Sequence, residues 1–409
     1  MRLLIMGTHT AWFCAIIMLS MAVTSCYGTL SKSDRKPKNS KAKIAKTAER
    51  SAPAVVSAHV NAEKSELEVD PNEVTVSSIL VEHAQLDIGE KKFNRPTLGY
   101  VTPWNSHGYN IAKWAAKKFT HISPVWFQLK PANIDGQKTC SIGGTHDIDQ
   151  RWMADVRSNN SDVSFVPRFL MEDWTSGTVD DFLYDEIWQR RCAQAMVDLI
   201  ERNEMQGVVM EMWLQLMSLT RGRMNKLLIE LVASWSDYFH AKDLEFILPI
   251  SPPLNEIYEY TSIISAENFA EVAKHVDYIN IMLYDYHIDR AAGVAPIGWI
   301  QRNMEFLLRE SPVSASKVLM GLNFYGFEFT PTKMNAITFS KYLEHLKSDD
   351  VLLNWDGTAS EHFIISGTTI CYYPSLASLS VRLRYAERMN MGVSIWELGQ
   401  GLPYFTRLL

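Results

Sequence analysis

Eight short apolar runs recur along the chain from residue 98 to residue 395. They are Leu98–Val101, His121–Leu129, Val163–Leu170, Gly207–Met212, Glu245–Ile250, Tyr278–Met282, Val318–Leu322 and Gly392–Ile395. Nearly continuous apolar and β-branched runs of this length are typical of strands that are buried on both faces of a parallel sheet. The pattern therefore predicts eight buried strands.

Most of these runs are separated by segments in which apolar residues recur with the period of a helix. Residues 181–201 and 224–239 are two examples. Alternating strands and helices predict an α/β fold with a parallel sheet, and eight strands over about 310 residues favour a closed TIM (β/α)8 barrel. A doubly wound open sheet is the alternative, but no glycine-rich phosphate turn follows any run.

The segment between the last two strands is too long for one helix. Residues 354–373 contain alternating apolar positions around a turn at Ser366-Gly367. We expect a small β-hairpin or α+β insertion between the seventh and eighth strands, which would form a wall beside the barrel mouth.

The N-terminal 92 residues differ from the rest. Residues 1–26 combine an early arginine, a short apolar run and small residues, which predicts a signal peptide; the alternative is a membrane anchor, but the run is shorter than the about 20 residues of a span. Residues 27–92 are predicted to be a low-complexity linker, with a short element within residues 65–87 that could dock on the main domain. Residues 93–409 are the predicted barrel.

Composition narrows the functional classes. Hydrophobic residues make up 47% of the chain and the net charge is −6, which gives no electrostatic reason to expect a nucleic acid or an anionic membrane as partner. The five cysteines form no motif with metal-ligand spacing, so we expect no metal and no organic cofactor, while one disulfide of undetermined pairing is possible. Asn159 begins an N-glycosylation sequon, which matters only if the chain is secreted.

Aromatic residues follow at least six of the eight runs. Ligands of such barrels bind at the C-terminal ends of the strands. Aromatic planes suit the apolar faces of sugars, and carboxylates and amides suit their hydroxyl groups. The candidate saccharide-binding residues are Tyr100, Trp126, Glu211, Trp213, Tyr284, Asp285, Tyr286 and Trp396. The alternative is that these aromatic side chains only close the core.

The fourth run carries a carboxylate. If the run stays extended, Val209, Glu211 and Trp213 share one face, and the apolar face opposite them should contact the helices. Glu211 would then point into the barrel, where a carboxylate must be paired or protonated. Its alternative role is a structural hydrogen-bond hub.

Several motifs resemble those of the glycoside hydrolases of family 18, the chitinase family, over residues 97–409. The family motif DGxDxDxE aligns with Gln206–Trp213, MxYD with Met282–Asp285, and the glycine-rich seventh strand with Gly321–Gly326. Gly392–Glu397 resembles the eighth strand, which carries a tryptophan at the floor of the cleft. Gly99–Asn105 and Ser394–Gly401 resemble a branch of chitinase-like lectins.

In this alignment Gln206, Val209 and Glu211 stand where the family has aspartates, and Trp213 stands where it has the general acid. Tryptophan has no proton to give a leaving group, so the resemblance implies that no catalytic residue remains. Glu211 lies about 6–7 Å deeper than residue 213 would, because it is two residues earlier on a strand. We also expect the Trp213 indole to offer a stacking face for a sugar.

The resemblance implies a non-catalytic saccharide-binding protein. Expected ligands are chitooligosaccharides and lipopolysaccharide, with a scavenger receptor of the stabilin type as partner, a role in innate immunity, and secretion or residence in the lysosome. Two alternatives stay open. One is a weak glycoside hydrolase with a displaced acid at Glu172, Asp173, Glu211 or Glu397, and the other is a protein-interaction scaffold.

Overall fold

The computed structural model describes residues 66–288 and 290–409. The predicted signal peptide and most of the predicted linker lie outside these residues. Each of the eight predicted runs contains a parallel strand. The strands are β1 (Thr97–Val101), β2 (His121–Pro124), β3 (Phe127–Ile134), β5 (Ser164–Phe165), β6 (Arg168–Met171), β7 (Gly207–Glu211), β8 (Glu245–Ile250), β9 (Tyr278–Ile281), β10 (Val318–Asn323) and β16 (Gly392–Trp396).

The pairing of these strands runs around a ring. Strands β6 to β10 pair in sequence, then β16 pairs with β10 and β1, and β1 pairs with β2. The second and third runs are each split in two, so β2 pairs with β5 and β3 pairs with β6. This circuit of parallel pairs is consistent with the predicted (β/α)8 barrel.

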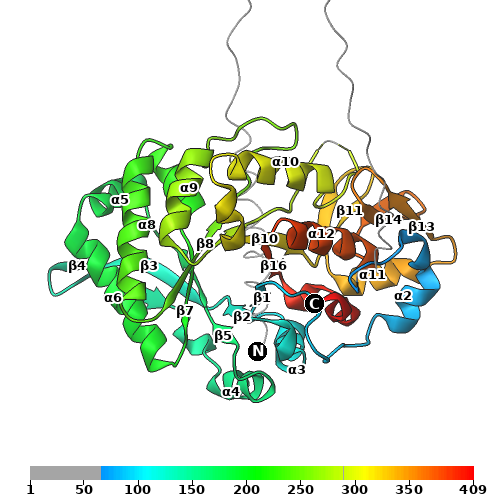
Figure 1. Cartoon of the computed structure of the whole chain (residues 1–409), viewed down its shortest axis with the longest axis horizontal. Coiled ribbons are helices and arrows are strands. Elements are labelled where there is room, and N and C mark those ends of the chain that lie inside the picture. Colours follow the sequence, from blue (N-terminus) through cyan, green and yellow to red (C-terminus); the bar gives the residue numbers. More distant parts are fainter. Residues whose placement is uncertain (1–65, 289) are drawn as a thin grey trace, which may run out of the picture. The chain divides into compact units, whose positions relative to one another are not determined.

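Helices follow most of the strands and lie around them (Figure 1). They are α3 (Ser106–Trp114), α4 (Gln150–Asn159), α5 (Ser176–Leu183), α6 (Glu186–Arg202), α7 (Trp213–Thr220), α8 (Asn225–His240), α9 (Ala266–His275), α10 (Ile297–Leu308) and α12 (Leu376–Arg388). The predicted helix at residues 181–201 is divided between α5 and α6, because the Asp185 side chain caps a new helix by accepting a hydrogen bond from the Trp188 amide.

Apolar side chains fill the ring of strands. Leu98, Val209, Ile247 and Leu319 come from four different strands, and Val166 comes from the link between β5 and β6. All five have no exposed surface and belong to one apolar cluster. A larger apolar cluster packs between the strands and the helices. The domain therefore has the two nested cores that a barrel with an outer helical layer requires.

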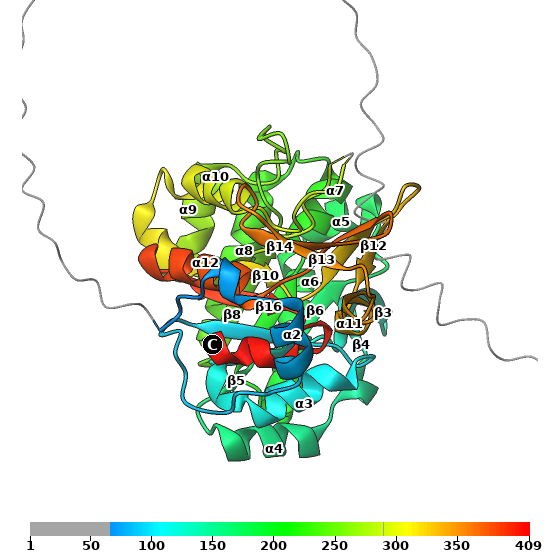
Figure 2. The ribbon, with the colours of Figure 1, turned by 90° about the vertical axis from the view of Figure 1, so that its right-hand side faces the viewer.

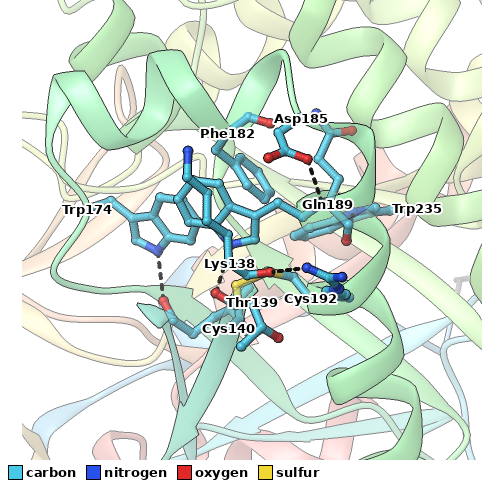
Figure 3. Close-up of a disulfide and its surroundings, with 12 residues drawn as sticks. Lys138, Thr139, Cys140, Trp174, Phe182, Asp185, Gln189, Cys192 and Trp235 are labelled. Atoms are coloured by element: carbon cyan, nitrogen blue, oxygen red, sulfur yellow. Dashed lines mark hydrogen bonds between the residues drawn. A yellow bond between two sulfur atoms is a disulfide. The ribbon is translucent and has the colours of Figure 1, made fainter. Parts of the chain in front are cut away.

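A hairpin projects from the second strand and is tied to a helix. Strand β4 (Gln137–Gly143) pairs antiparallel with β3, and Cys140 on β4 forms a disulfide with Cys192 on α6. Figure 3 shows this disulfide among Trp174, Phe182 and Trp235. The sequence allowed a disulfide but did not identify its pairing.

A second, antiparallel sheet lies in sequence between β10 and β16. Its order is β12 (Met334–Ile337), β11 (Gly326–Phe329), β15 (Thr369–Tyr372), β14 (Glu361–Ser366) and β13 (Leu352–Asp356), with α11 (Phe339–Leu346) after β12. Figure 2 shows α11 close to this sheet. The turn between β14 and β15 contains Gly367 in the left-handed region, at the place where the sequence predicted a turn.

Residues 66–92 pack on the barrel domain, although the predicted linker extends to residue 92. Helix α2 (Val76–Glu82) contains the buried Ile79, and the Lys92 amide donates to the carbonyl of Leu409. A salt bridge joins Glu82 to Arg407. Within the residues described here, no helix is long and apolar enough to cross a membrane.

Candidate functional site

Six side chains, contributed by five strands or by the residues just after them, converge at the C-terminal end of the barrel. We call Tyr100, Arg168, Glu211, Tyr284, Asp285 and Trp396 the mouth cluster. Inward positions deeper in the barrel are fully buried, whereas Arg168, Glu211, Tyr284 and Trp396 are half-buried and Asp285 is exposed. The mouth cluster is therefore the level at which the barrel interior meets solvent, where ligands of this fold class bind.

Trp396, at the end of β16, lies at the centre of the cluster. Its ring centroid is 5.3 Å from that of Tyr100, and the Arg168 guanidinium lies 5.8 Å from its centroid. Tyr100 is only 2% exposed, so it supports the indole from below and offers no open face of its own. These contacts fix the orientation of an accessible aromatic side chain.

A salt bridge crosses from the third strand to the fourth. Arg168 donates from Nε to Glu211 Oε2 over 2.5 Å. Burial disfavours the charge of Arg168, but the neighbouring Glu211 carboxylate outweighs burial and raises the pKa of the guanidinium. Glu211 thus points into the barrel, as predicted, and is a carboxylate held by a permanent cation.

A buried polar chain lies beneath the mouth cluster. Asn280 donates from Nδ2 to the Tyr100 hydroxyl over 2.7 Å and accepts from the Ser394 hydroxyl over 2.5 Å. Asn280 and Ser394 are each about 1% exposed. Buried polar groups are stabilising only when they are paired, and this chain pairs residues from three strands under the site.

Asp285 and Tyr284 form the side of the cluster that comes from the sixth strand. Tyr325 donates its hydroxyl proton to Asp285 Oδ1. Although Asp285 keeps exposed surface, surrounding protein atoms desolvate its carboxyl group and raise its pKa. Desolvation also raises the pKa of Tyr284 well above the usual value, so Tyr284 is a neutral phenol with a hydroxyl that can donate.

The predicted role of Trp213 as a stacking platform is wrong for this conformation. The strand ends at Glu211 and α7 begins at Trp213, so strand alternation no longer applies to this residue. Its side chain is 1% exposed, belongs to the outer apolar cluster, and donates from Nε1 to the carbonyl of Ile263 over 2.9 Å. Trp213 is a core residue.

The prediction that Trp126 binds a saccharide is also wrong. The second strand breaks at Val125-Trp126, and the successive residues Trp126 and Phe127 both belong to the outer apolar cluster. Trp126 has no exposed surface, and its Nε1 donates to the Tyr109 hydroxyl over 2.6 Å. It therefore has no open face for a sugar.

Other predicted residues lie around or below the cluster. Tyr286 is half-buried beside it, stacked edge-on against Trp299, with its hydroxyl 3.3 Å from the carbonyl of Glu256. Val209 is fully buried inside the barrel. Gln206 precedes β7 at the opposite end of the strand, where its Oε1 accepts from the Phe165 amide.

The carboxylates considered as replacement acids are all engaged. Lys130 lies 2.7 Å from Glu172 and 3.0 Å from Asp173. Glu397 is 1% exposed and accepts hydrogen bonds from Asn105 Nδ2 over 2.6 Å and from the Gly399 amide over 2.9 Å. Burial raises the pKa of Glu397 to about 7.

Two hollows in the described chain lie away from the mouth cluster. One of about 10 Å³ lies beside Asn323 and Arg382, and one of about 420 Å³ lies beside Leu308 and Met389. Over residues 66–288 and 290–409, no group of three or more histidine, cysteine or acidic side chains is placed to hold a metal ion.

The saccharide-binding residues predicted from the sequence do not include three contributors to this site, namely Arg168, Asn280 and Tyr325. Arg168 lies within the apolar run Val163–Leu170 and could have been identified as an inward charge, because it comes two residues after Val166, which is buried inside the ring of strands. Asn280 is a polar residue within an apolar strand, which is a comparable signal.

The sequence matches the glycosyl hydrolases family 18 over residues 96–401. The chain belongs to this family. Residues of the mouth cluster lie within the matched region of the glycosyl hydrolases family 18, from Tyr100 at its start to Trp396 at its end. The family assignment and the strand circuit agree on a barrel whose site is at the strand ends.

Among curated proteins, the chain is 23% identical to the cortical fragment-lytic enzyme of Bacillus subtilis over 181 residues, which is 41% of each protein. The chain thus spans less than half the length of that family 18 relative. Among solved structures, a chitinase from Chromobacterium violaceum is similar with a TM-score of 0.63 at 14% identity, over 77% of this chain and 97% of that one.

A variant of the class V chitinase from Nicotiana tobaccum, solved in complex with NAG4, is similar with a TM-score of 0.60 at 14% identity. The match covers 77% of this chain and 98% of that one. At such identities these likenesses establish the shared fold of the family.

Proposed function

We propose that this family 18 chain is a saccharide-binding protein that holds N-acetylglucosamine oligosaccharides at the mouth cluster without hydrolysing them. One observation carries the proposal: the mouth presents a fixed, half-buried indole, while Glu211, the inward carboxylate of the fourth strand, is bound to Arg168. The site can contact a sugar but has no free acid on that strand.

The polar groups beside Trp396 suit a sugar. The apolar face of a pyranose ring would rest on the indole, and the Tyr284 hydroxyl and the Asp285 carboxyl would meet its hydroxyl and acetamido groups. A class V chitinase in the same family was solved with NAG4, which makes chitooligosaccharides the first ligands to test.

We expect no hydrolysis, and the reason lies at the end of the fourth strand. Family 18 chemistry is substrate-assisted, yet one side chain must still protonate the leaving oxygen from about 3 Å. Trp213, which aligns with the family's acid, has no such proton, and its indole is turned into the outer core. Removal of a general acid typically costs about 10²–10⁴-fold in rate.

The proposal includes secretion or lysosomal residence, a stabilin-type receptor as partner, lipopolysaccharide as a second ligand and a role in innate immunity. The Cys140–Cys192 disulfide supports an oxidising compartment. Asn159 is exposed at the end of α4, where a glycan could be attached. The receptor and lipopolysaccharide rest only on the lectin-like sequence motifs.

Asp285 supports an alternative, weak hydrolase activity. Its pKa is raised and its side chain keeps exposed surface, so it is the carboxyl group of the mouth cluster best suited to donate a proton. Slow release of short sugars that is abolished by Asp285→Asn, but not by Glu172→Gln, would establish this alternative.

The deciding experiment is a calorimetric titration of the secreted protein with chitotetraose, followed by chromatography of the cell contents. Saturating heats with intact sugar are the expected result. Shorter sugars in the chromatogram would replace the proposal with the hydrolase alternative. The absence of heat at millimolar sugar would refute saccharide binding of this class.

A further inference from the structure

Arg168 is the one cation of the mouth cluster, and only part of its hydrogen-bonding capacity is used. Its Nε donates to Glu211. Among residues 66–288 and 290–409, the terminal nitrogens Nη1 and Nη2 have no hydrogen-bond partner. Neither nitrogen is fully buried. The side chain is 12% exposed, so these atoms reach solvent at the mouth.

The two terminal nitrogens present a fork of donors with no acceptor. A planar fork of this kind matches the two oxygens of a carboxylate, and charge-assisted hydrogen bonds are about twice as strong as neutral ones. The guanidinium also lies 5.8 Å from the centre of the Trp396 ring. A sugar resting on the indole would bring a substituent of its ring to the fork.

The charges around Arg168 do not prevent its terminal nitrogens from binding an anion. Glu211 occupies the Nε edge of the guanidinium and balances its charge, while Tyr284 adds a neutral hydroxyl. Asp285 is the opposing carboxyl group of the cluster, and its acceptor oxygen Oδ1 is already bonded by Tyr325. Recognition of an anion here would depend on directed donors and not on net charge.

We propose that the mouth cluster selects N-acetylhexosamine glycans that carry a carboxylate, which Arg168 Nη1 and Nη2 bind while the sugar ring lies on Trp396. This inference rests on the proposed saccharide binding and adds the chemical class of the preferred ligand. The carboxylate could belong to a lactyl ether on the sugar or to a uronic acid.

The test compares each acidic glycan with its own methyl ester. The probes are a β-1,4 tetrasaccharide of alternating N-acetylglucosamine and N-acetylmuramic acid, a tetrasaccharide of alternating N-acetylglucosamine and glucuronic acid, and both esters, with chitotetraose as neutral reference. We expect at least one acid to bind about 10- to 100-fold more tightly than its ester, the scale of a charge-assisted hydrogen bond. The preferred acid identifies the source of the carboxylate.

Variants assign the preference to Arg168. The double variant Arg168→Gln/Glu211→Gln removes both charges together, so no unpaired carboxylate remains, and it should bring the acid-to-ester ratio to about one, since only the charge-assisted part is lost. Lys130→Gln removes a cation that Glu172 and Asp173 already bind, and it should keep the preference. Thermal melting of each variant checks its folding.

The outcomes separate the two proposals. Ratios within twofold of one for both acids in the parent protein, with chitotetraose still bound, would overturn this inference and leave saccharide binding intact. A preference that persists in the folded double variant would also overturn it. If none of the five glycans binds, the proposed function itself fails.

Discussion

Substitutions of Trp213 test whether this residue belongs to the protein core or contacts a bound sugar. The indole is 1% exposed and its N–H bonds to the Ile263 carbonyl. Replacement by alanine should lower the free energy of unfolding by about 3–5 kcal/mol, the usual cost of truncating a buried tryptophan. Trp213→Phe keeps most of the packing but leaves the Ile263 carbonyl without a partner, which should cost about 1–3 kcal/mol.

Sugar affinity should behave differently from stability. We expect the affinity for chitotetraose to stay within about twofold of the parent in folded Trp213→Phe, because the side chain has no open face at the mouth. Urea unfolding gives the stability change, and calorimetry at a temperature where the variant is folded gives the affinity.

The Trp396→Ala variant provides the matched control, since its tryptophan is half-buried at the mouth. A Trp213→Phe variant that keeps its stability and loses tenfold or more in affinity would refute this assignment. So would measurable chitin hydrolysis by Trp213→Glu, because a carboxylate at this position should not reach a sugar in this conformation.

Three further predictions concern other parts of the domain. Trp396→Ala should weaken chitotetraose binding by about 1–3 kcal/mol in calorimetry, the scale of a lost aromatic platform, and equal affinity would remove the main support for the mouth as a sugar site. Replacing Cys140 and Cys192 by serine should lower the free energy of unfolding by about 4 kcal/mol, because the closed loop spans 52 residues; a loss under 1 kcal/mol would contradict this chain-entropy argument. The pKa of Glu397 is raised from 4.5 to about 7, so the folded state binds a proton more tightly than the unfolded state does. The free energy of unfolding should therefore fall by roughly 3 kcal/mol as pH rises from about 4.5 to 7, and then level off. Unfolding of the parent and of Glu397→Gln at pH 5 and pH 8 checks this sign, and an equal pH dependence in both would exclude Glu397 as its source.

The strand positions could be predicted from the sequence because most of the strands are buried on both faces. Continuous apolar runs then mark each strand without any need to know which side chain faces inward. Members of the mouth cluster such as Tyr284 and Trp396 could also be predicted from the sequence, since the carboxyl ends of parallel strands meet at one end of a barrel. Neither step depends on the parity of a residue within its strand.

The sequence-based predictions failed where they depended on parity, that is, on which face of a strand a residue occupies. Trp126 lies at the break between β2 and β3, where it and Phe127 both face outward, and Trp213 is the first residue of a helix. The two-residue period of a strand therefore applies to neither tryptophan. Both tryptophans are apolar enough to be stable on either side of a strand, and composition could not distinguish the two positions.

Charged residues carry more information, because burial of a charge without a partner is costly. Arg168 on the third strand and Glu211 on the fourth were both inward by parity, and their salt bridge follows from the adjacency of those strands. Inward charges on neighbouring strands are therefore a stronger sequence signal for this site than the more numerous aromatic residues.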